Sequence, residues 1–132
     1  MQADRIVKSD KPAGGIEKLV RACFDAYVTK DRAAIESLLA DDFHFTSPLD
    51  NRIDRKTYFE VCWPGSERID GFEIERLTVD GDHAFVTYEG HMGKETFRNT
   101  EVHTVRGDKI AEVEVYFGWN VPHKVKPGKH KG

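Results

Sequence analysis

Hydrophobic and polar residues alternate most regularly between residues 96 and 119, a stretch that reads TFRNTEVHTVRGDKIAEVEVYFGW. β-Branched and aromatic residues are frequent in it, and a glycine lies near its middle, within residues 106–109. Alternation on both sides of a glycine-bearing turn is the strongest short-range signal of a β-hairpin. The pattern therefore predicts two long antiparallel strands joined by a tight turn.

One face of this hairpin is apolar after the turn, where Val113, Val115 and Phe117 occupy alternate positions. We expect this face to point into the core. Successive side chains of a strand point to opposite sides, so a face that includes Val105 includes every second residue before it. Three polar residues are thereby predicted on the inner face: Asn99, Glu101 and His103.

The residues before the hairpin predict helices and shorter strands. From Ile16 onward, apolar residues recur at the three- and four-residue steps of one helix face. Asp31 and Asp54 are suited to cap a second helix, ending near residues 40–42, and a third over residues 55–62. Strands are predicted at 43–47, 68–79 and 83–91, with a polar turn at 49–53. Both phases of 83–91 are equally apolar, so its inward face stays open.

This order of elements predicts an α+β fold, with three N-terminal helices covering one face of a mostly antiparallel sheet. A long helix closing a twisted sheet tends to leave a pocket between the two layers. The folded domain is predicted at residues 14–120. Residues 1–13 are expected to form a flexible arm, and residues 121–132 a basic, flexible tail.

Composition and charge narrow the functional classes. The chain has 132 residues, which suits one domain, and no apolar run or N-terminal segment resembles a membrane span or signal peptide. We therefore expect a cytoplasmic protein that does not bind membranes. Its net charge is −3 although the last twelve residues hold four lysines and no acid. The remaining body is acidic, which argues against binding nucleic acid.

Metal and thiol chemistry find little support in the sequence. Cys23 and Cys62 have no metal-like or redox-like spacing, so we expect free, buried thiols. None of the six histidines forms an HxH or HxxxH pair. The sequence accordingly predicts no metal and no other cofactor.

The order and spacing of several short motifs resemble the NTF2-like superfamily, specifically its SnoaL-like branch. The resemblance runs from Ile16 to Trp119, and it implies a strongly curved sheet that forms a cone around a mostly apolar pocket. It also implies a homodimer through the outer face of the sheet. The motifs that carry it are LLADDF at 38–43, Ser47-Pro48, Asp54-Arg55, VDGDHA at 79–84, GDKI at 107–110 and VYFG at 115–118.

Known active sites of this superfamily fit the chain only in part. Ketosteroid isomerases use a tyrosine on the first helix, an aspartate before the first strand's proline and a protonated aspartate on a late strand. The matching positions here hold Cys23, Ser47 and Glu101, so the resemblance argues against steroid isomerisation. The segment Asn99-Thr100-Glu101 also lacks the arginine of limonene-epoxide-hydrolase-like sites. SnoaL-type cyclases depend on an acid on the late strands, for which Glu101 is the nearest candidate.

Glu101 is therefore the best candidate for catalysis, with His103 as its relay or orienting partner. A carboxyl group in an apolar pocket is disfavoured as an anion, which suits a general acid or a base acting near neutral pH. A structural ion pair is the competing interpretation. Residues expected to bind a small apolar molecule are Asn99, Cys23, Tyr27, Phe45, Ser47, Tyr58, Trp63, Val115 and Phe117.

Three functions remain open from the sequence. The protein could act as an isomerase, lyase or cyclase on an apolar substrate, with Glu101 as its acid or base. It could instead bind a ligand in the same pocket without converting it, or it could be a dimerisation module. A pocket filled by Phe45, Trp63 and Phe117 would favour the last of these.

Overall fold

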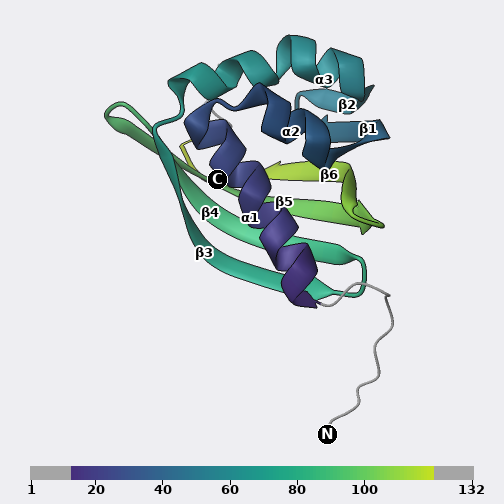
Figure 1. Ribbon diagram of the computed structural model, residues 1–132. Helices are drawn as coiled ribbons and strands as arrows, with labels where there is room; N and C mark the ends of the chain where they lie inside the picture. The colour runs from purple at the N-terminus through teal and green to yellow at the C-terminus, as the bar shows by residue number, and fades with distance from the viewer. Residues whose placement is uncertain (1–12, 121–132) are drawn as a thin grey trace, which may run out of the picture.

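The computed structural model describes residues 13–120, which form one sheet covered on one face by helices (Figure 1). Residues 1–12 and 121–132, which contain most of the expected arm and the expected basic tail, lie outside the described part of the chain. The elements in chain order are α1 (Ala13–Thr29), α2 (Arg32–Leu38), β1 (Leu39–Ser47), β2 (Asp50–Asp54), α3 (Arg55–Val61), the 3-10 helix η1 (Trp63–Arg68), β3 (Gly71–Asp80), β4 (His83–Met92), β5 (Glu95–Arg106) and β6 (Lys109–Phe117).

The six strands lie in the order β2-β1-β6-β5-β4-β3. Strand β1 runs parallel to β6, and every other neighbouring pair is antiparallel. Figure 1 shows α1 lying across the sheet, with α2 and α3 beside β1 and β2. The predicted α+β class with a mostly antiparallel sheet is confirmed, whereas the strong curvature of the sheet stays a prediction.

The helices form where the sequence places apolar faces and caps. On α1, the side chains of Ile16, Val20 and Phe24 are buried at the three- and four-residue spacing of one helix face. The carboxylate of Asp31 accepts a hydrogen bond of 3.0 Å from the backbone N–H of Ala34, and thereby caps α2. Asp54 caps α3 in the same way through the N–H of Thr57, at 2.9 Å. Both predicted caps are confirmed.

The β5–β6 hairpin has the predicted register and orientation. Arg106 pairs with Lys109 across the turn, where Gly107 has a φ of 65°, a conformation that glycine adopts without steric cost. Cross-strand neighbours share a face of the sheet, and the pairs Asn99–Phe117, Glu101–Val115 and His103–Val113 all lie on the inner face. The polar row expected on this face is confirmed.

Some predicted boundaries were wrong because pairing with β6 and β1 overrides local preference. The second helix ends at Leu38, and β1 begins at Leu39, where its pairing with Ile110 of β6 starts. Residues 49–53 were expected as a turn, but residues 50–54 form β2 by pairing with β1. The turn-forming residues in this segment gave no local indication of a strand, because a strand is stabilised mainly by the neighbouring strands that it pairs with. The sequence also missed η1, which follows the predicted helix end at Trp63-Pro64.

Candidate functional site

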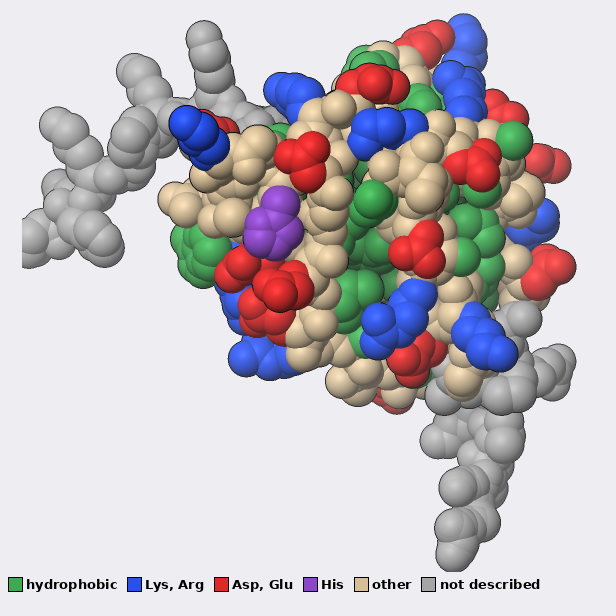
Figure 2. All heavy atoms as spheres, turned by 60° about the vertical axis from the view of Figure 1, so that its left-hand side comes forward, with side chains coloured by type: hydrophobic (Ala, Val, Ile, Leu, Met, Phe, Trp, Pro, Cys, Tyr) green, Lys and Arg blue, Asp and Glu red, His purple; other side chains and the backbone are tan. Residues whose placement is uncertain are grey.

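A cavity of about 570 Å³ lies between the helices and the inner face of the sheet. Most of its wall is apolar. Its mouth is formed by exposed residues of the β1–β2 turn, α3 and η1, including Leu49, Val61 and Arg68. Figure 2 shows hydrophobic side chains in a hollow at this end of the molecule, surrounded by charged ones. A volume of this size suits a small organic molecule.

Nearly all the residues that the sequence assigns to the site line this cavity. They are Cys23, Tyr27, Phe45, Ser47, Tyr58, Asn99, Glu101, His103, Val115 and Phe117. Trp63 was also expected to bind the molecule, but it is not among the residues that line the cavity. Its ring is buried against Tyr27, at 4.9 Å between centroids, and against Phe59, at 6.3 Å. Trp63 is the first residue of the 3-10 helix η1, and its side chain is buried in the core.

Glu101 is held by hydrogen bonds to both of its carboxylate oxygens. Oε2 accepts a hydrogen bond of 2.6 Å from the hydroxyl of Tyr88, and Oε1 lies 2.8 Å from Nε2 of His103. His103 is almost fully buried, whereas the side chain of Glu101 is 15% exposed. The carboxylate is therefore fixed in orientation and still reachable from the cavity.

Tyr88 is the member of this hydrogen-bonded group that the sequence argument missed. It lies on β4 beside Asn99 of β5, and its hydroxyl also accepts a hydrogen bond of 3.2 Å from Nδ2 of Asn99. The inward phase of β4 is that of Ala84, Val86 and Tyr88, which are buried. The two-residue turn at 93–94 is the sequence feature that predicts this orientation. It sets the register between β4 and β5, in which Tyr88 pairs with Asn99 on the inner face.

Burial keeps the thiol of Cys23 and the hydroxyl groups of Tyr27 and Tyr58 in their protonated forms. Desolvation raises the pKa of the Cys23 thiol far above its ordinary value, and the nearby carboxylate of Glu101 raises it further. Burial also raises the pKa values of Tyr27 and Tyr58, whose hydroxyl groups are hydrogen-bonded to each other. Neither Cys23 nor these tyrosines can act as a base near neutral pH.

The resemblance to ketosteroid isomerases places Ser47 at the position of their base, but a serine hydroxyl bound to a carboxylate is not a base. Its hydroxyl donates a hydrogen bond of 2.8 Å to Asp50 at the cavity mouth. Close to this pair, burial and the charge of Asp50 raise the pKa of Cys62 to about 12. Both thiols are free, as predicted, but Cys62 is only half-buried.

A group of possible metal ligands lies on the opposite face of the sheet, outside the cavity. Glu73 on β3 and Glu89 and His91 on β4 place their ligand atoms within 4.8 Å of one another. The sequence search for helical or HxH spacing could not detect a group formed by cross-strand pairing. Its position on the outer face separates it from the cavity and from Glu101.

Three solved structures illustrate the likeness of this fold to known proteins. An NTF2-like protein of unknown function from Cytophaga hutchinsonii has 18% sequence identity and a TM-score of 0.66, with 89% of this chain and 95% of that chain covered. A SnoaL-like protein of unknown function from Burkholderia thailandensis has 21% identity and a TM-score of 0.68, with 81% and 97% covered. An LEH-like epoxide hydrolase from M. tuberculosis has 24% identity and a TM-score of 0.64, with 80% and 84% covered.

Sequence comparison gives the family. No curated protein matches the chain. Among residues 13–120, no helix is long and apolar enough to cross a membrane. The sequence model of the SnoaL-like domain matches residues 20–113, which include most of the cavity wall and all of the hydrogen-bonded group around Glu101. The chain therefore belongs to the SnoaL-like domain family, and its fold is that of the NTF2-like proteins.

Proposed function

We propose that the protein binds a small, largely apolar molecule in the cavity and that Glu101 moves a proton on it. The observation that carries this proposal is the carboxylate of Glu101, fixed by Tyr88 and His103 and exposed to an apolar cavity. A positioned base of this kind serves reactions that begin with proton removal, such as isomerisation, elimination or cyclisation.

The hydrogen bonds around Glu101 favour the role of a base over that of an acid. Tyr88 donates to one oxygen and His103 approaches the other, so both contacts are best satisfied when the carboxyl group is ionised. His103 orients the carboxylate, and its second nitrogen, Nδ1, has no protein partner.

The surroundings argue against activation of water for epoxide opening. That chemistry requires an arginine beside the acids of the site. On the strand of Glu101, Arg98 is on the outer face of the sheet, where it pairs with Glu75, and the arginine that lines the cavity, Arg68, belongs to η1 at the mouth. The similarity to an epoxide hydrolase therefore supports the fold and not that reaction.

A binding protein without catalysis is the second candidate. It is favoured by the large apolar share of the wall, because such a cavity binds apolar molecules whether or not it converts them. A filled, vestigial pocket is not favoured, since Phe45 and Phe117 line the cavity without closing it and Trp63 packs elsewhere.

An assay for chemical conversion of bound compounds distinguishes the catalytic function from binding alone. A panel of apolar compounds with a hydroxyl, an acidic C–H beside a carbonyl, or both, is incubated with the protein in D₂O and followed by NMR and mass spectrometry. We expect deuterium incorporation or conversion of at least one compound, and a loss of about 100-fold or more in Glu101→Gln. The matched control is Glu114→Gln, because Glu114 is on the next strand and faces outward.

Each outcome has a definite meaning. Conversion that survives Glu101→Gln would show that Glu101 is not the base. Binding without conversion in the unmodified protein would leave the binding function alone.

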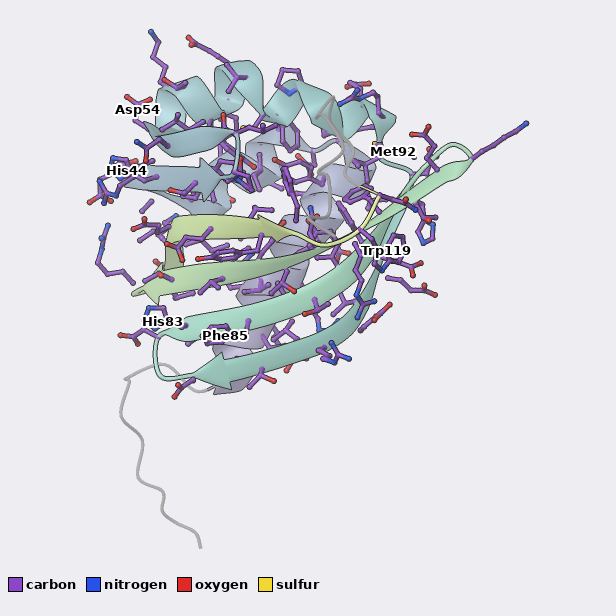
Figure 3. All side chains as sticks on the ribbon, turned by 180° about the vertical axis from the view of Figure 1, so that it is seen from behind. His44, Asp54, His83, Phe85, Met92 and Trp119 are labelled. Carbon is purple, nitrogen blue, oxygen red and sulfur yellow. The ribbon has the colours of Figure 1, made fainter. Side chains whose placement is uncertain are left out.

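We also propose that the protein forms a homodimer through the outer face of its sheet. Figure 3 looks onto this face and labels Phe85, which lies on β4. Phe85 is 42% exposed, and Tyr116 on β6 is 55% exposed. Exposed aromatic side chains on one sheet face are typical of protein contacts.

A further inference from the structure

At the polar end of the cavity, two hydrogen-bonding side chains, Tyr88 and His103, are directed at the carboxylate of Glu101. The hydroxyl hydrogen of Tyr88 is directed at Oε2 of Glu101, and Nε2 of His103 lies at Oε1. An ionised carboxylate can accept about four hydrogen bonds, so Glu101 keeps unused capacity. Because its side chain is partly exposed and lines the cavity, that capacity faces a bound molecule.

The orientation of the Asn99 amide follows from the same network. Tyr88 has a single hydroxyl hydrogen, which it donates to Glu101, so towards Asn99 the phenol oxygen can only accept. The amide nitrogen of Asn99 must therefore face Tyr88, as it does at 3.2 Å. The amide oxygen Oδ1 is left buried without a protein partner, although Asn99 lines the cavity.

His103 adds a third acceptor. In the neutral ring, Nε2 carries the hydrogen that it donates to Glu101, and Nδ1 carries a lone pair and accepts hydrogen bonds. This atom is also buried without a protein partner. Oδ1 of Asn99 and Nδ1 of His103 are both buried, so the carboxylate of Glu101 is the acceptor of this group that a molecule in the cavity reaches.

We propose that this cavity selects apolar molecules that carry a hydroxyl group, which donates its hydrogen bond to Glu101. This inference rests on the proposed function of the cavity and names the class of molecule that it takes. A molecule with only a carbonyl or ether oxygen would direct lone pairs at a carboxylate and leave it unpaired. Sites built to pair with a hydroxyl discriminate strongly against analogues that lack one.

The geometry also defines the proton transfer that such a molecule would undergo. Glu101 removes the hydroxyl hydrogen, so the O–H bond breaks and a new O–H bond forms on the carboxylate. The electron pair and the negative charge stay on the substrate oxygen, which becomes a nucleophile. Tyr88 and His103 keep Glu101 in position through the transfer.

Three fluorescent probes with the same apolar ring system test this selection. 1-Hydroxypyrene has the donor, 1-methoxypyrene blocks it, and 1-acetylpyrene carries an acceptor alone. Their dissociation constants are measured by fluorescence titration of the full chain at pH 6.5. We expect 1-hydroxypyrene to bind at least about tenfold more tightly than either analogue.

Two variants assign the selectivity to Glu101. Glu101→Gln keeps the shape of the side chain and loses its charge, and should reduce the preference for the hydroxyl probe to about threefold or less. Glu114→Gln should leave the preference unchanged, since Glu114 faces outward. Circular dichroism confirms that each variant is folded.

The outcomes separate this inference from the function on which it rests. If all three probes bind equally, or if 1-acetylpyrene binds best, the hydroxyl selection is wrong while the cavity still binds apolar molecules. A preference that persists in Glu101→Gln would also overturn it. If none of the probes binds, the proposed cavity function fails, and the inference fails with it.

Discussion

Tyr88 connects Asn99 to Glu101 through a single hydroxyl group, so its removal is a specific test of the site. In Tyr88→Phe the ring still fills its place against Phe24 and Phe72, but the carboxylate loses a donor. A hydrogen bond to a charged group contributes about 1.5–3 kcal/mol, so we expect a loss of that order in the free energy of unfolding.

Urea unfolding measures this loss, with Tyr116→Phe as the control. Tyr116 is an exposed tyrosine on the outer face, and its change should stay within about 0.5 kcal/mol. Equal stability in Tyr88→Phe and the unmodified protein would mean that the hydroxyl does not hold Glu101. Conversion of substrate, where it is found, should also fall in Tyr88→Phe, because the base is less well positioned.

The sequence placed Glu101 and His103 on the inner face because strand alternation is a strict rule. The apolar row at residues 113, 115 and 117 marks the inner face of the hairpin, and Glu101 and His103 pair with members of this row. Tyr88 escaped the same argument because β4 is apolar on both faces, with Phe85 outside and Val86 inside. Periodicity cannot choose between two apolar faces, and the choice comes from pairing with β5.

At the scale of elements, α3 begins at the Asp54 cap, and the contribution of this carboxylate to stability depends on pH. The backbone N–H of Thr57 donates to the Asp54 carboxylate and holds its pKa below the ordinary value of 3.8, and the hydroxyl of Thr57 acts in the same direction. A carboxyl group with a lowered pKa stabilises the folded state above its unfolded pKa. This stabilisation is lost as the pH falls from about 4 through the folded pKa.

We therefore expect Asp54→Asn to lose less stability on acidification than the unmodified protein. Asparagine also caps helices, but it does not titrate in this range. Urea midpoints of both proteins between pH 6 and pH 2.5 check this, with Asp108→Asn in the exposed β5–β6 turn as the control. Parallel curves for Asp54→Asn and the unmodified protein would contradict the assignment of this stabilisation to the cap.

The sequence predicted helices better than the short strands for a physical reason. A capped amphipathic helix carries its signals within its own residues, as Asp31 and Asp54 show. Strand β2 has turn-forming residues, and Arg52 has a φ of 51°, so nothing local indicates a strand. Its existence depends on β1, which lies before it in the chain and supplies the hydrogen bonds.

For the whole molecule, the sheet has two functional faces if the proposals hold. The inner face forms the cavity wall, and the outer face carries the exposed side chains of Phe85 and Tyr116. Helices cover the inner face of the sheet, so the outer face is the one open to a second copy. A contact through it would leave the cavity mouth at Leu49 and Val61 accessible.

The double variant Phe85→Lys/Tyr116→Lys tests this contact. Two lysines on each copy would meet two on its partner, and buried like charges oppose association while the lost aromatic rings weaken it. We expect sedimentation to show a dimer for the unmodified protein and a dissociation constant at least about tenfold higher for the variant. Val61→Lys is the matched control, because Val61 is 58% exposed but lies on α3 at the cavity mouth. A monomeric unmodified protein, or a double variant as dimeric as Val61→Lys, would show that this face does not join two copies.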